Sequence, residues 1–554
     1  MSLFQGSHNF KASGTFVDGP LTVNIHNAEA SNSASKISPG IDALLRASTP
    51  QAIHDSSARS HAQCFPGTRE EHIRNITSWG KGEWGTNNAR ILWLHGPAGV
   101  GKSALAQSCV GGIGDKVVGT FFFSRPNQWN HPMSVFPTVA YQLATCHEGY
   151  RDIVNAIILR DPLVLEKSIP IQFRELLVKP LAQLGASQRQ ILENSIIILD
   201  GLDECDGLDA QCTIIETVVN SIHQHTTPFL WTFFSRRESH IESSFSSELA
   251  SQITLQLTLP VSRDADKDIE AYIRDGFRLI RAKYNLPPAI SWPTEKAIQQ
   301  IVDQSGGLFI YAASVIRYVY QNNGAFGPEA QLQVVLDLGN NQGNRPTNPL
   351  ASLDSFYHLI MKQIPRDILP TTLAILCIHS HQIWGRADDA LIYCSVLSLS
   401  PSAFYAAMNN LSSVLEVNKS LDGMPIGFSY YHASFGEFLT DVGRSTSEFC
   451  INMPDVHNRC FAASAKLLRS LSCLDNDTQL AEVLPWQPLK SSSDIIFAIA
   501  VLSLFIFEQK ALDMSVLEDL SKINWNNIAE PSPSVGWGIP GELIQGFRRS
   551  VCTR

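Results

Sequence analysis

The chain has 554 residues, which at ~100–200 residues per domain implies about three to five domains. Hydrophobic residues make up 44% of the chain and charged residues 17%, which excludes a wholly disordered or collagen-like protein. The formal net charge is -10, from 42 Lys+Arg against 52 Asp+Glu. We therefore expect no nucleic-acid partner, because neutralising backbone phosphates needs a basic surface.

The cysteines and the apolar segments indicate the cellular compartment. The eleven cysteines include no CxxC pair, so neither a zinc ribbon nor a thioredoxin-type site is expected, and the odd count indicates reduced thiols. Residues 1–40 lack the apolar core of a signal peptide. The longest apolar run, residues 495–507, has 13 residues, against ~20 for a membrane span, and we interpret it as a buried core helix. These features predict a cytoplasmic protein with no stable membrane span.

Residues 1–63 form the first predicted region and are rich in Ser, Asn, Ala and His. Within them, residues 9–26 alternate between apolar and polar types around Asp18-Gly19, which is typical of a β-hairpin. A strand pair without a core is only marginally stable, so two interpretations stay open. The region is a flexible arm, or it is an adhesive segment that pairs with copies of itself or with a partner's sheet edge.

From residue 64 onwards, short apolar runs alternate with helical stretches. Residues 70–79 have the spacing of an amphipathic helix. The apolar runs with the length of buried strands are residues 89–95, 117–124, 195–200 and 228–235. Strands separated by helices predict an α/β domain over residues 64–255, with a parallel sheet and helices on both faces.

Beyond about residue 260 the strand pattern fades and helical periodicity dominates. The helical stretches are residues 264–284, 294–322, 354–364 and 368–379. Residues 339–349 are a polar, turn-rich linker, so we place a domain boundary there. The chain is thus divided into a helical bundle over 256–349, a further domain over 350–450 and a helical C-terminal tail over 451–554.

Residues 96–103 match the GxxxxGK[ST] pattern of a phosphate-binding P-loop. Glycines let the backbone N–H groups face phosphate oxygens, Lys102 offers a positive charge to the β- and γ-phosphates, and Ser103 can ligate Mg²⁺. The strand before the loop and the helix after it favour this interpretation over a glycine turn without a ligand. The predicted nucleotide-binding residues are Gly96, Pro97, Ala98, Gly99, Val100, Gly101, Lys102, Ser103 and Ala104.

A second acidic site is predicted where the apolar run 196–200 ends. Asp200 is expected to hold Mg²⁺ through water, as a Walker B residue does. Two more carboxylates follow in Gly201-Leu202-Asp203-Glu204. Glu204 is expected to orient or deprotonate the attacking water, with Asp203 supporting the metal or the water. The alternative is that both carboxylates only cap the next helix.

These motifs resemble those of the NACHT group of STAND P-loop NTPases. LHGPAGVGKSALA, IIILDGLDEC and LWTFFSRRE are similar to the P-loop, Walker B and sensor 1 segments of its large fungal set with a nephrocystin-like NACHT module. Residues 64–69, 305–312 and 432–439 also resemble that set, so the resemblance spans roughly residues 64–450. It implies ATP or ADP with Mg²⁺ as ligands, and a winged-helix-type domain over 350–450.

The resemblance also implies roles for single residues. Arg236 at the sensor 1 position would contact the γ-phosphate, and a surface arginine is the alternative. His432 matches the winged-helix histidine that reaches the β-phosphate of ADP in related proteins, and a core histidine is the alternative. Thr68 would lie near the adenine. Gly307-Leu308-Phe309 departs from the Pro-containing turn that contacts adenine in many relatives.

Other motifs receive simpler interpretations. The pairs in His223-Gln224-His225 and His379-Ser380-His381 lack a third ligand, so we expect surface histidines rather than a metal site. No GxSxG or HExxH motif occurs, so a hydrolase effector is not supported.

These features predict an ATP/ADP-dependent switch with slow ATP hydrolysis. ADP would hold the winged-helix-type domain closed, and exchange for ATP would open it and permit self-association. The resemblance implies an output in innate immune or self/non-self signalling in fungi, with an unknown protein partner at the N-terminal arm or the C-terminal region. Two alternatives stay open: a P-loop ATPase or kinase with steady turnover, and a scaffold that binds nucleotide for structure only.

Overall fold

The computed structural model describes residues 38–57, 63–83, 89–287, 291–321, 327–340, 350–380, 389–419 and 425–472. The predicted hairpin 9–26, the apolar run 495–507 and most of the linker 339–349 lie outside these residues. Within the described stretches no helix is long and apolar enough to cross a membrane. The nine cysteines in those stretches are free thiols.

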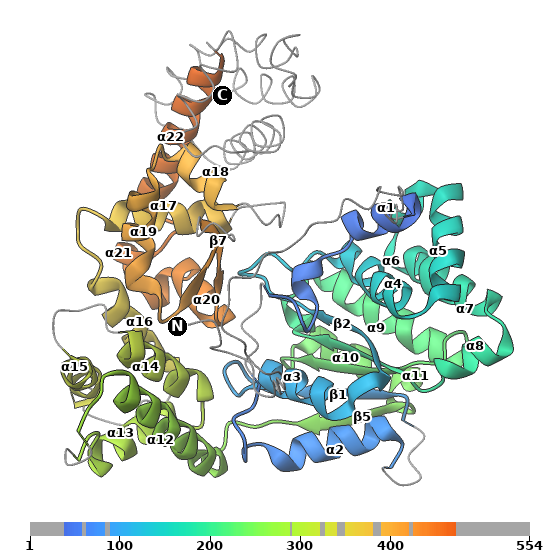
Figure 1. The fold of residues 1–554 in the computed structure, drawn as a ribbon, viewed down its shortest axis with the longest axis horizontal. Coiled ribbons are helices and arrows are strands. Elements are labelled where there is room, and N and C mark those ends of the chain that lie inside the picture. The colour runs from blue at the N-terminus through green and yellow to red at the C-terminus, as the bar shows by residue number, and fades with distance from the viewer. Residues whose placement is uncertain are drawn as a thin grey trace, which may run out of the picture. The chain divides into compact units, whose positions relative to one another are not determined.

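A five-stranded parallel sheet forms the α/β part of the fold, as predicted (Figure 1). Its strands are β1 (Ile91–His95), β2 (Val117–Phe122), β3 (Ile196–Asp200), β4 (Leu230–Ser235) and β5 (Thr254–Thr258). The order is β2-β3-β4-β1-β5, so β4 pairs with both β1 and β3. The sequence analysis missed β5, because this edge strand is half-buried or exposed and has no continuous apolar run.

Helices cover both faces of this sheet (Figure 1), because successive side chains of its central strands point into two separate apolar cores. The covering helices are α2 (Glu70–Lys81), α3 (Lys102–Ile113), α4 (Val135–Cys146), α9 (Leu208–His223) and α10 (Ser239–Phe245). Leu92 and Leu94 pack with α2 and α3 on one face. Trp93, between them on β1, packs with α4, α9 and α10 on the other. The remaining helices of this part are α5 (Glu148–Arg160), α6 (Ile169–Phe173), α7 (Lys179–Gln183), α8 (Ala186–Ile191) and α11 (Glu248–Ser251).

One helix precedes the α/β part in the chain, α1 (Pro39–Ala47), and packs against it. Its Ile41 and Leu44 are buried in the same core as Trp93. The backbone N–H of Gly40 donates to Oδ1 of Asn155 on α5 at 2.9 Å. The flexible arm predicted over residues 1–63 therefore does not include this helix, whose short apolar face gave too little periodicity to be recognised.

Four helices follow the sheet: α12 (Asp266–Lys283), α13 (Glu295–Ser305), α14 (Phe309–Gln321) and α15 (Pro328–Asn340). The helical stretch predicted over residues 294–322 is divided into α13 and α14. The chain turns between them at Gly306 and Gly307, whose φ angles are 55° and 83°. A Cβ atom on Gly307 would lie 2.7 Å from the carbonyl oxygen of Ser262, so this close approach requires glycine.

Residues 350–472, called the C-terminal segment below, contain helices and one antiparallel strand pair. The helices are α16 (Leu350–Lys362), α17 (Leu369–Ser380), α18 (Asp389–Val396), α19 (Pro401–Met408), α20 (Ala433–Thr440), α21 (Val442–Phe449) and α22 (Pro454–Ser472). The strands are β6 (Leu415–Lys419) and β7 (Pro425–Tyr430). These two strands were not predicted individually from the sequence, although Asp422-Gly423 between them is a dipeptide that favours a hairpin turn.

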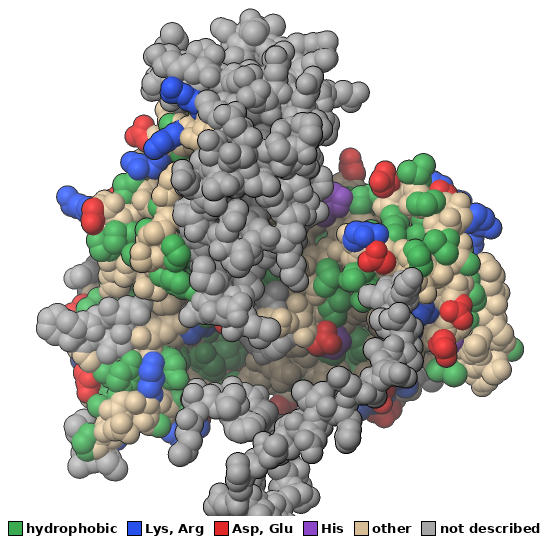
Figure 2. Space-filling model, turned by 45° about the horizontal axis from the view of Figure 1, so that its top comes forward, with side chains coloured by type: hydrophobic (Ala, Val, Ile, Leu, Met, Phe, Trp, Pro, Cys, Tyr) green, Lys and Arg blue, Asp and Glu red, His purple; other side chains and the backbone are tan. Residues whose placement is uncertain are grey.

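Figure 2 shows one face of the molecule with its side chains coloured by type. The basic and acidic side chains of the described residues are interspersed on this face rather than gathered by sign.

Candidate functional site

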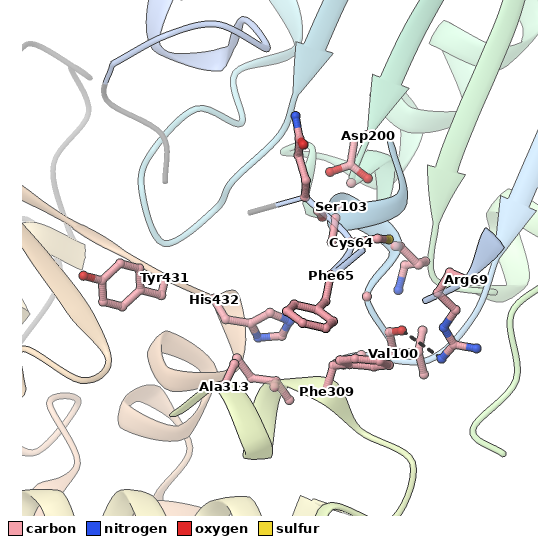
Figure 3. Close-up of a pocket in the computed structure, with 18 of the residues that line it drawn as sticks. Cys64, Phe65, Arg69, Val100, Ser103, Asp200, Phe309, Ala313, Tyr431 and His432 are labelled. Carbon is pink, nitrogen blue, oxygen red and sulfur yellow. Dashed lines mark hydrogen bonds between the residues drawn. The ribbon is translucent and has the colours of Figure 1, made fainter. Parts of the chain in front are cut away.

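One cavity collects most of the residues that the sequence assigned to nucleotide binding (Figure 3). It has a volume of about 580 Å³ and is lined by the P-loop, the ends of β3 and β4, helix α14 and the start of α20. Because β1, β3 and β4 are adjacent parallel strands, their C-terminal ends meet at one edge of the sheet, where open α/β sheets bind ligands. The predicted residues that line it are Thr68, Ala98, Gly99, Val100, Gly101, Lys102, Ser103, Ala104, Asp200, Asp203, Glu204, Arg236 and His432.

The P-loop takes a backbone path that requires glycine. Gly99 and Gly101 have φ angles of 79° and 98°, a region that residues with side chains rarely adopt. At Gly96 a Cβ atom would lie 2.2 Å from the carbonyl oxygen of Leu259. The loop leads directly into α3, whose first residues line the cavity, and the positive end of the helix dipole favours an anion there.

Lys102 is held over the P-loop by the loop itself. Its ammonium group donates to the carbonyl oxygens of Gly96 and Pro97 at 2.7 and 2.8 Å, which gives these two predicted residues a role although they do not line the cavity. Burial lowers the pKa of Lys102, and the carboxylate of Asp203 opposes this effect. A phosphate would favour the charged lysine in the same way as Asp203 does.

Asp200 and Ser103 supply oxygen ligands of the kind that Mg²⁺ prefers. Asp200 is the buried last residue of β3, Ser103 is the second residue of α3, and both line the cavity. The described residues contain no group of three or more His, Cys, Asp or Glu that could hold a metal without further ligands. The two oxygen donors fit a magnesium ion that would complete its coordination with nucleotide phosphates and water, the usual arrangement for Mg²⁺.

Asp203 binds Arg236, a contact that its predicted role beside a metal or a water did not include. Its Oδ1 accepts the backbone N–H of Arg236 at 2.8 Å, and its Oδ2 lies 3.1 Å from Nε of the same residue. The Asp203 side chain is only 6% exposed. In this arrangement both oxygens orient the arginine that follows β4.

Glu204 is positioned by the chain that follows β2. Its Oε2 accepts the backbone N–H of Arg125 at 3.0 Å. Burial and the neighbouring Asp203 raise the pKa of Glu204 to about 8, against the lowering effect of the Arg125 N–H. A carboxyl group with this pKa exchanges its proton near neutral pH, which suits general acid–base chemistry. Neither Asp203 nor Glu204 caps α9, whose N-cap residue is Gly207.

Arg236 connects the sheet to the C-terminal segment. Its guanidinium forms an ion pair with Glu437 on α20, in addition to the one with Asp203. Burial disfavours the charged arginine, but Glu437 and Asp203 outweigh this effect and raise the pKa of Arg236. The Arg236 and Glu437 side chains are 27% and 31% exposed, so their pair is less screened than a surface ion pair. The sequence analysis missed Glu437, because one charged residue on an amphipathic helix forms no pattern.

His432 is the N-cap residue of α20 and lines the same cavity (Figure 3). Its Nδ1 accepts the backbone N–H of Ser434 at 3.0 Å. A neutral imidazole with an accepting Nδ1 carries its proton on Nε2, so this ring offers one N–H donor. Burial, with Arg236 and Lys102 nearby, lowers the pKa of His432 to about 3, which keeps the ring neutral at physiological pH.

Another part of the cavity wall is apolar and aromatic. Its residues are Cys64, Phe65, Tyr272, Phe309, Ile310 and Ala313. The Phe65 and Tyr272 rings meet edge to face with centroids 5.8 Å apart, and the Arg69 guanidinium lies 5.6 Å from the centre of the Phe309 ring. Aromatic faces of this kind suit a nucleobase. The hydroxyl of Thr68 donates to the Phe65 carbonyl oxygen at 2.6 Å, so Thr68 shapes the turn that carries Phe65.

Arg317 and Tyr431 also line the cavity, and the sequence analysis missed both. The Arg317 guanidinium lies 4.2 Å from the centre of the Tyr431 ring and donates to the carbonyl oxygen of Ser413 at 3.1 Å. Phe309, Ala313 and Arg317 follow a spacing of four residues on α14, and all three line the cavity. That spacing places them on one face of a helix. It was the feature of the sequence that could have indicated Arg317 as a residue of the site.

His379 corrects the expectation of surface histidines, because it is buried with 2% of its surface exposed. Its Nδ1 lies 2.7 Å from the hydroxyl of Tyr393 and its Nε2 lies 2.8 Å from the carbonyl oxygen of Pro126. Burial lowers the pKa of His379 to about 4. His223 pairs through Nε2 with the carbonyl oxygen of Leu249 at 2.9 Å, so each of the two rings binds a backbone carbonyl oxygen.

Among solved structures, the Cdc6p protein of Pyrobaculum aerophilum is similar at 14% identity and a TM-score of 0.33, over 70% of this chain and 96% of that chain. ORC2 of Aeropyrum pernix, solved as ADPNP-ADP complexes, is similar at 12% identity and a TM-score of 0.31, over 69% and 95%. Drosophila ORC bound to DNA is similar at 11% identity and a TM-score of 0.29, over 76% and 96%. Likenesses with these TM-scores establish neither a shared overall fold nor a shared ligand.

A comparison with curated proteins finds no match. The family model described as "Nephrocystin 3, N-terminal" matches residues 70–258. This stretch contains helix α2 and all five strands of the parallel sheet, with the P-loop after β1 and the acidic residues after β3. Residues 70–258 are therefore a P-loop NTPase module of the NACHT type, similar to the N-terminal region of nephrocystin 3.

Proposed function

We propose that this protein is an ATP/ADP-binding STAND switch with slow ATP hydrolysis. The observation that carries the proposal is the ion pair between Arg236 and Glu437. Arg236 stands at the end of β4, between the strands that carry the P-loop and Asp200, whereas Glu437 belongs to the C-terminal segment. A γ-phosphate and Glu437 compete for the same guanidinium, so the number of phosphates on the nucleotide biases the contact with the C-terminal segment.

Within this proposal each part of the cavity has a task. Residues 96–104 hold the phosphates, and Phe65 and Phe309 flank the adenine. Ser103 and Asp200 hold Mg²⁺, which supplies charge neutralisation for the phosphates when bound. Glu204 accepts a proton from the attacking water. The Nε2–H of His432 donates to a phosphate oxygen of ADP and so favours the docked C-terminal segment.

The proposal divides the chain as its sequence suggests. We assign an NTPase domain to residues 64–255, a helical domain to 256–349 and a winged-helix-type domain to 350–450, followed by a helical region over 451–554, of which residues 473–554 lie outside the described residues. The antiparallel pair β6–β7, which precedes α20, supports the winged-helix type. A cytoplasmic location and NLR-like signalling through self-association and an unknown protein partner belong to the same proposal, which the NACHT-type module supports.

The switch is tested by size-exclusion chromatography with light scattering. The full chain is loaded either with ADP or with Mg²⁺ and a non-hydrolysable ATP analogue. We expect a monomer with ADP and a larger assembly with the analogue. A monomer in both states together with steady ATP turnover would contradict the switch and favour an ATPase, and a monomer in both states without turnover would favour a scaffold.

A further inference from the structure

The chain after β2 makes a tight turn at residues 125–128 that is fixed to the sheet. Two backbone hydrogen bonds close it, from Trp129 N–H to the Ser124 carbonyl oxygen at 2.9 Å and from Ser124 N–H to the Trp129 carbonyl oxygen at 3.3 Å. Gln128 has a φ angle of 60° and donates its N–H to the Arg125 carbonyl oxygen at 3.1 Å. Trp129 is buried in one of the two sheet cores. The turn is therefore a small, closed unit with little freedom to deform.

One side of the 125–128 turn contacts the acidic residues after β3. The Arg125 N–H donates to Oε2 of Glu204 at 3.0 Å, and the Arg125 guanidinium donates to the carbonyl oxygen of Asp203 at 2.8 Å. Next to the turn, Asp206 N–H donates to the carbonyl oxygen of Asn130 at 2.8 Å. A displacement of the turn therefore displaces the donor that holds the Glu204 carboxylate.

The other side of the same turn contacts the C-terminal segment. Oδ1 of Asn127 accepts the backbone N–H of Tyr430 at 2.7 Å, and Nδ2 of Asn127 donates to the Tyr430 carbonyl oxygen at 3.3 Å. Nε2 of His379 lies 2.8 Å from the carbonyl oxygen of Pro126, and the side-chain amide of Gln128 donates to the His379 carbonyl oxygen. Three consecutive turn residues thus pair with α17 and β7.

Helix α20 approaches the turn as well. A Cβ atom on Gly436 would lie 3.1 Å from both Cβ and Cγ of Pro126, which is closer than most real contacts of a Cβ atom. The helix that carries Glu437 and begins after His432 is therefore also in contact with this turn. A shift of α20 or of β7 would therefore move the turn through these direct contacts.

We propose that the 125–128 turn couples docking of the C-terminal segment to the position of Glu204, with Asn127 as a positioning residue for ATP hydrolysis. This inference rests on the proposed function and adds the means by which docking controls turnover. Because the turn is closed on itself, a shift at Tyr430 moves Asn127 and the Arg125 N–H together. A general base must stay within hydrogen-bond reach of its proton, and small misplacements of a catalytic group lower the rate steeply.

The charges and hydrogen bonds around Glu204 also predict that moving the turn away lowers the rate of hydrolysis. The Arg125 N–H favours the ionised carboxylate and lowers the pKa of Glu204, whereas burial and the charges of Asp203 and Glu437 raise it. The Arg236 guanidinium also lowers it. If the turn moves away, the lost hydrogen bond leaves the carboxyl group more protonated and less able to accept a proton.

The first test is the substitution Asn127→Ala in the full chain, with Asn155→Ala as its matched control. Asn155 also joins two elements by a side-chain bond to a backbone N–H, but between α1 and α5. We expect kcat for Mg²⁺-ATP to fall roughly tenfold in Asn127→Ala with KM unchanged, and no change in Asn155→Ala. Gly436→Ala, which presses on Pro126 without removing a hydrogen bond, should lower kcat in the same direction. Equal kcat in Asn127→Ala and the wild type would overturn the proposal.

The second test uses hydrogen exchange and needs no hydrolysis. In wild-type protein with bound ADP, the Arg125 and Tyr430 amides should both be protected. In Asn127→Ala the Tyr430 amide loses its acceptor, and coupling predicts that the Arg125 amide loses protection as well. Faster exchange at Tyr430 with unchanged exchange at Arg125 would overturn the coupling. A wild-type chain that binds neither ATP nor ADP would instead overturn the proposed function.

Discussion

Two walls of the cavity differ in what holds their side chains. On the wall formed by Lys102, Arg236 and His432, called the charged wall, the polar groups bind protein atoms: Lys102 binds loop carbonyls, Arg236 binds two carboxylates and His432 binds a backbone N–H. On the wall formed by Phe65 and Phe309, called the aromatic wall, the rings contact aromatic and cationic neighbours. We therefore expect the charged wall, and not the aromatic wall, to exchange partners when a nucleotide binds.

This difference assigns the two walls different tasks in a switch. ATP and ADP share one base and differ in the number of phosphates, so contacts with the base add equal binding energy to both nucleotides. A ligand shifts a conformational equilibrium only through its differential affinity for the two states. In the proposed switch the charged wall therefore distinguishes ATP from ADP, and the aromatic wall contributes affinity that is common to both nucleotides.

The largest expected effect is that of Lys102→Ala on the charged wall. A hydrogen bond to a charged group contributes about 1.5–3 kcal/mol, so we expect the Kd for both nucleotides to rise roughly 10- to 160-fold. Isothermal titration calorimetry with ATP and with ADP measures this change. Unchanged affinity for both nucleotides would show that the phosphates do not bind this loop.

The next largest effect is expected from Phe65→Ala on the aromatic wall. Stacking of a base on an aromatic ring is worth about 1–3 kcal/mol, so the Kd should rise roughly 5- to 160-fold. The rise should be the same for ATP and ADP, because both have the same base. A loss confined to one nucleotide in the same calorimetric experiment would remove the proposed division between the walls.

Glu437→Gln should change the preference between the nucleotides rather than the common affinity. Without its charge, this residue no longer competes with the γ-phosphate for Arg236, so ATP should bind about fivefold more tightly while ADP is unaffected. The matched control is Glu242→Gln, which removes the neighbouring and more exposed pair with Arg237 and should change neither affinity. An equal gain for ADP would show that Glu437 does not distinguish the phosphates.

The last expected effect is on the pH dependence of stability rather than on nucleotide affinity. The pKa of His432 is about 3 in the folded protein, below the ordinary value near 6.5 for an unfolded chain. Between these values the unfolded chain binds a proton that the folded chain excludes, so stability falls as the pH falls. His432→Asn keeps a good N-cap residue and should reduce the loss of stability between pH 7 and 5 by about 1–2 kcal/mol. Thermal unfolding of both proteins at the two pH values checks this, and parallel curves would contradict the neutral buried ring.

The part of the site that consists of contiguous motifs was predictable from the sequence. The P-loop glycines, Lys102 and Asp200 lie in short segments whose spacing fixes their geometry, since a strand, a loop and a helix follow one another directly. The strands β1 to β4 were also predicted, because their runs of buried apolar residues are continuous. The α/β class followed from the same pattern.

The remaining features depend on contacts between segments that are distant in the sequence. The identity of a single residue does not indicate which distant residue it contacts. Glu437 meets Arg236, and Asn127 meets Tyr430, only after the C-terminal segment has packed against the NTPase module. Asp203 was predicted to support the metal or the water because the sequence places it beside Glu204, and folding in addition brings Arg236 to both of its oxygens. Helix α1 was missed for a related reason, because its few apolar residues matter only once a partner surface exists.

The most direct test of the central claim is to identify the nucleotide that the protein retains. The chain is purified without added nucleotide and denatured, and the released compound is identified and counted by chromatography. We predict about one equivalent of ADP per chain, because a docked C-terminal segment with His432 in place retains the diphosphate. A site without nucleotide in a protein that turns over ATP rapidly would contradict the account and favour an ordinary P-loop ATPase.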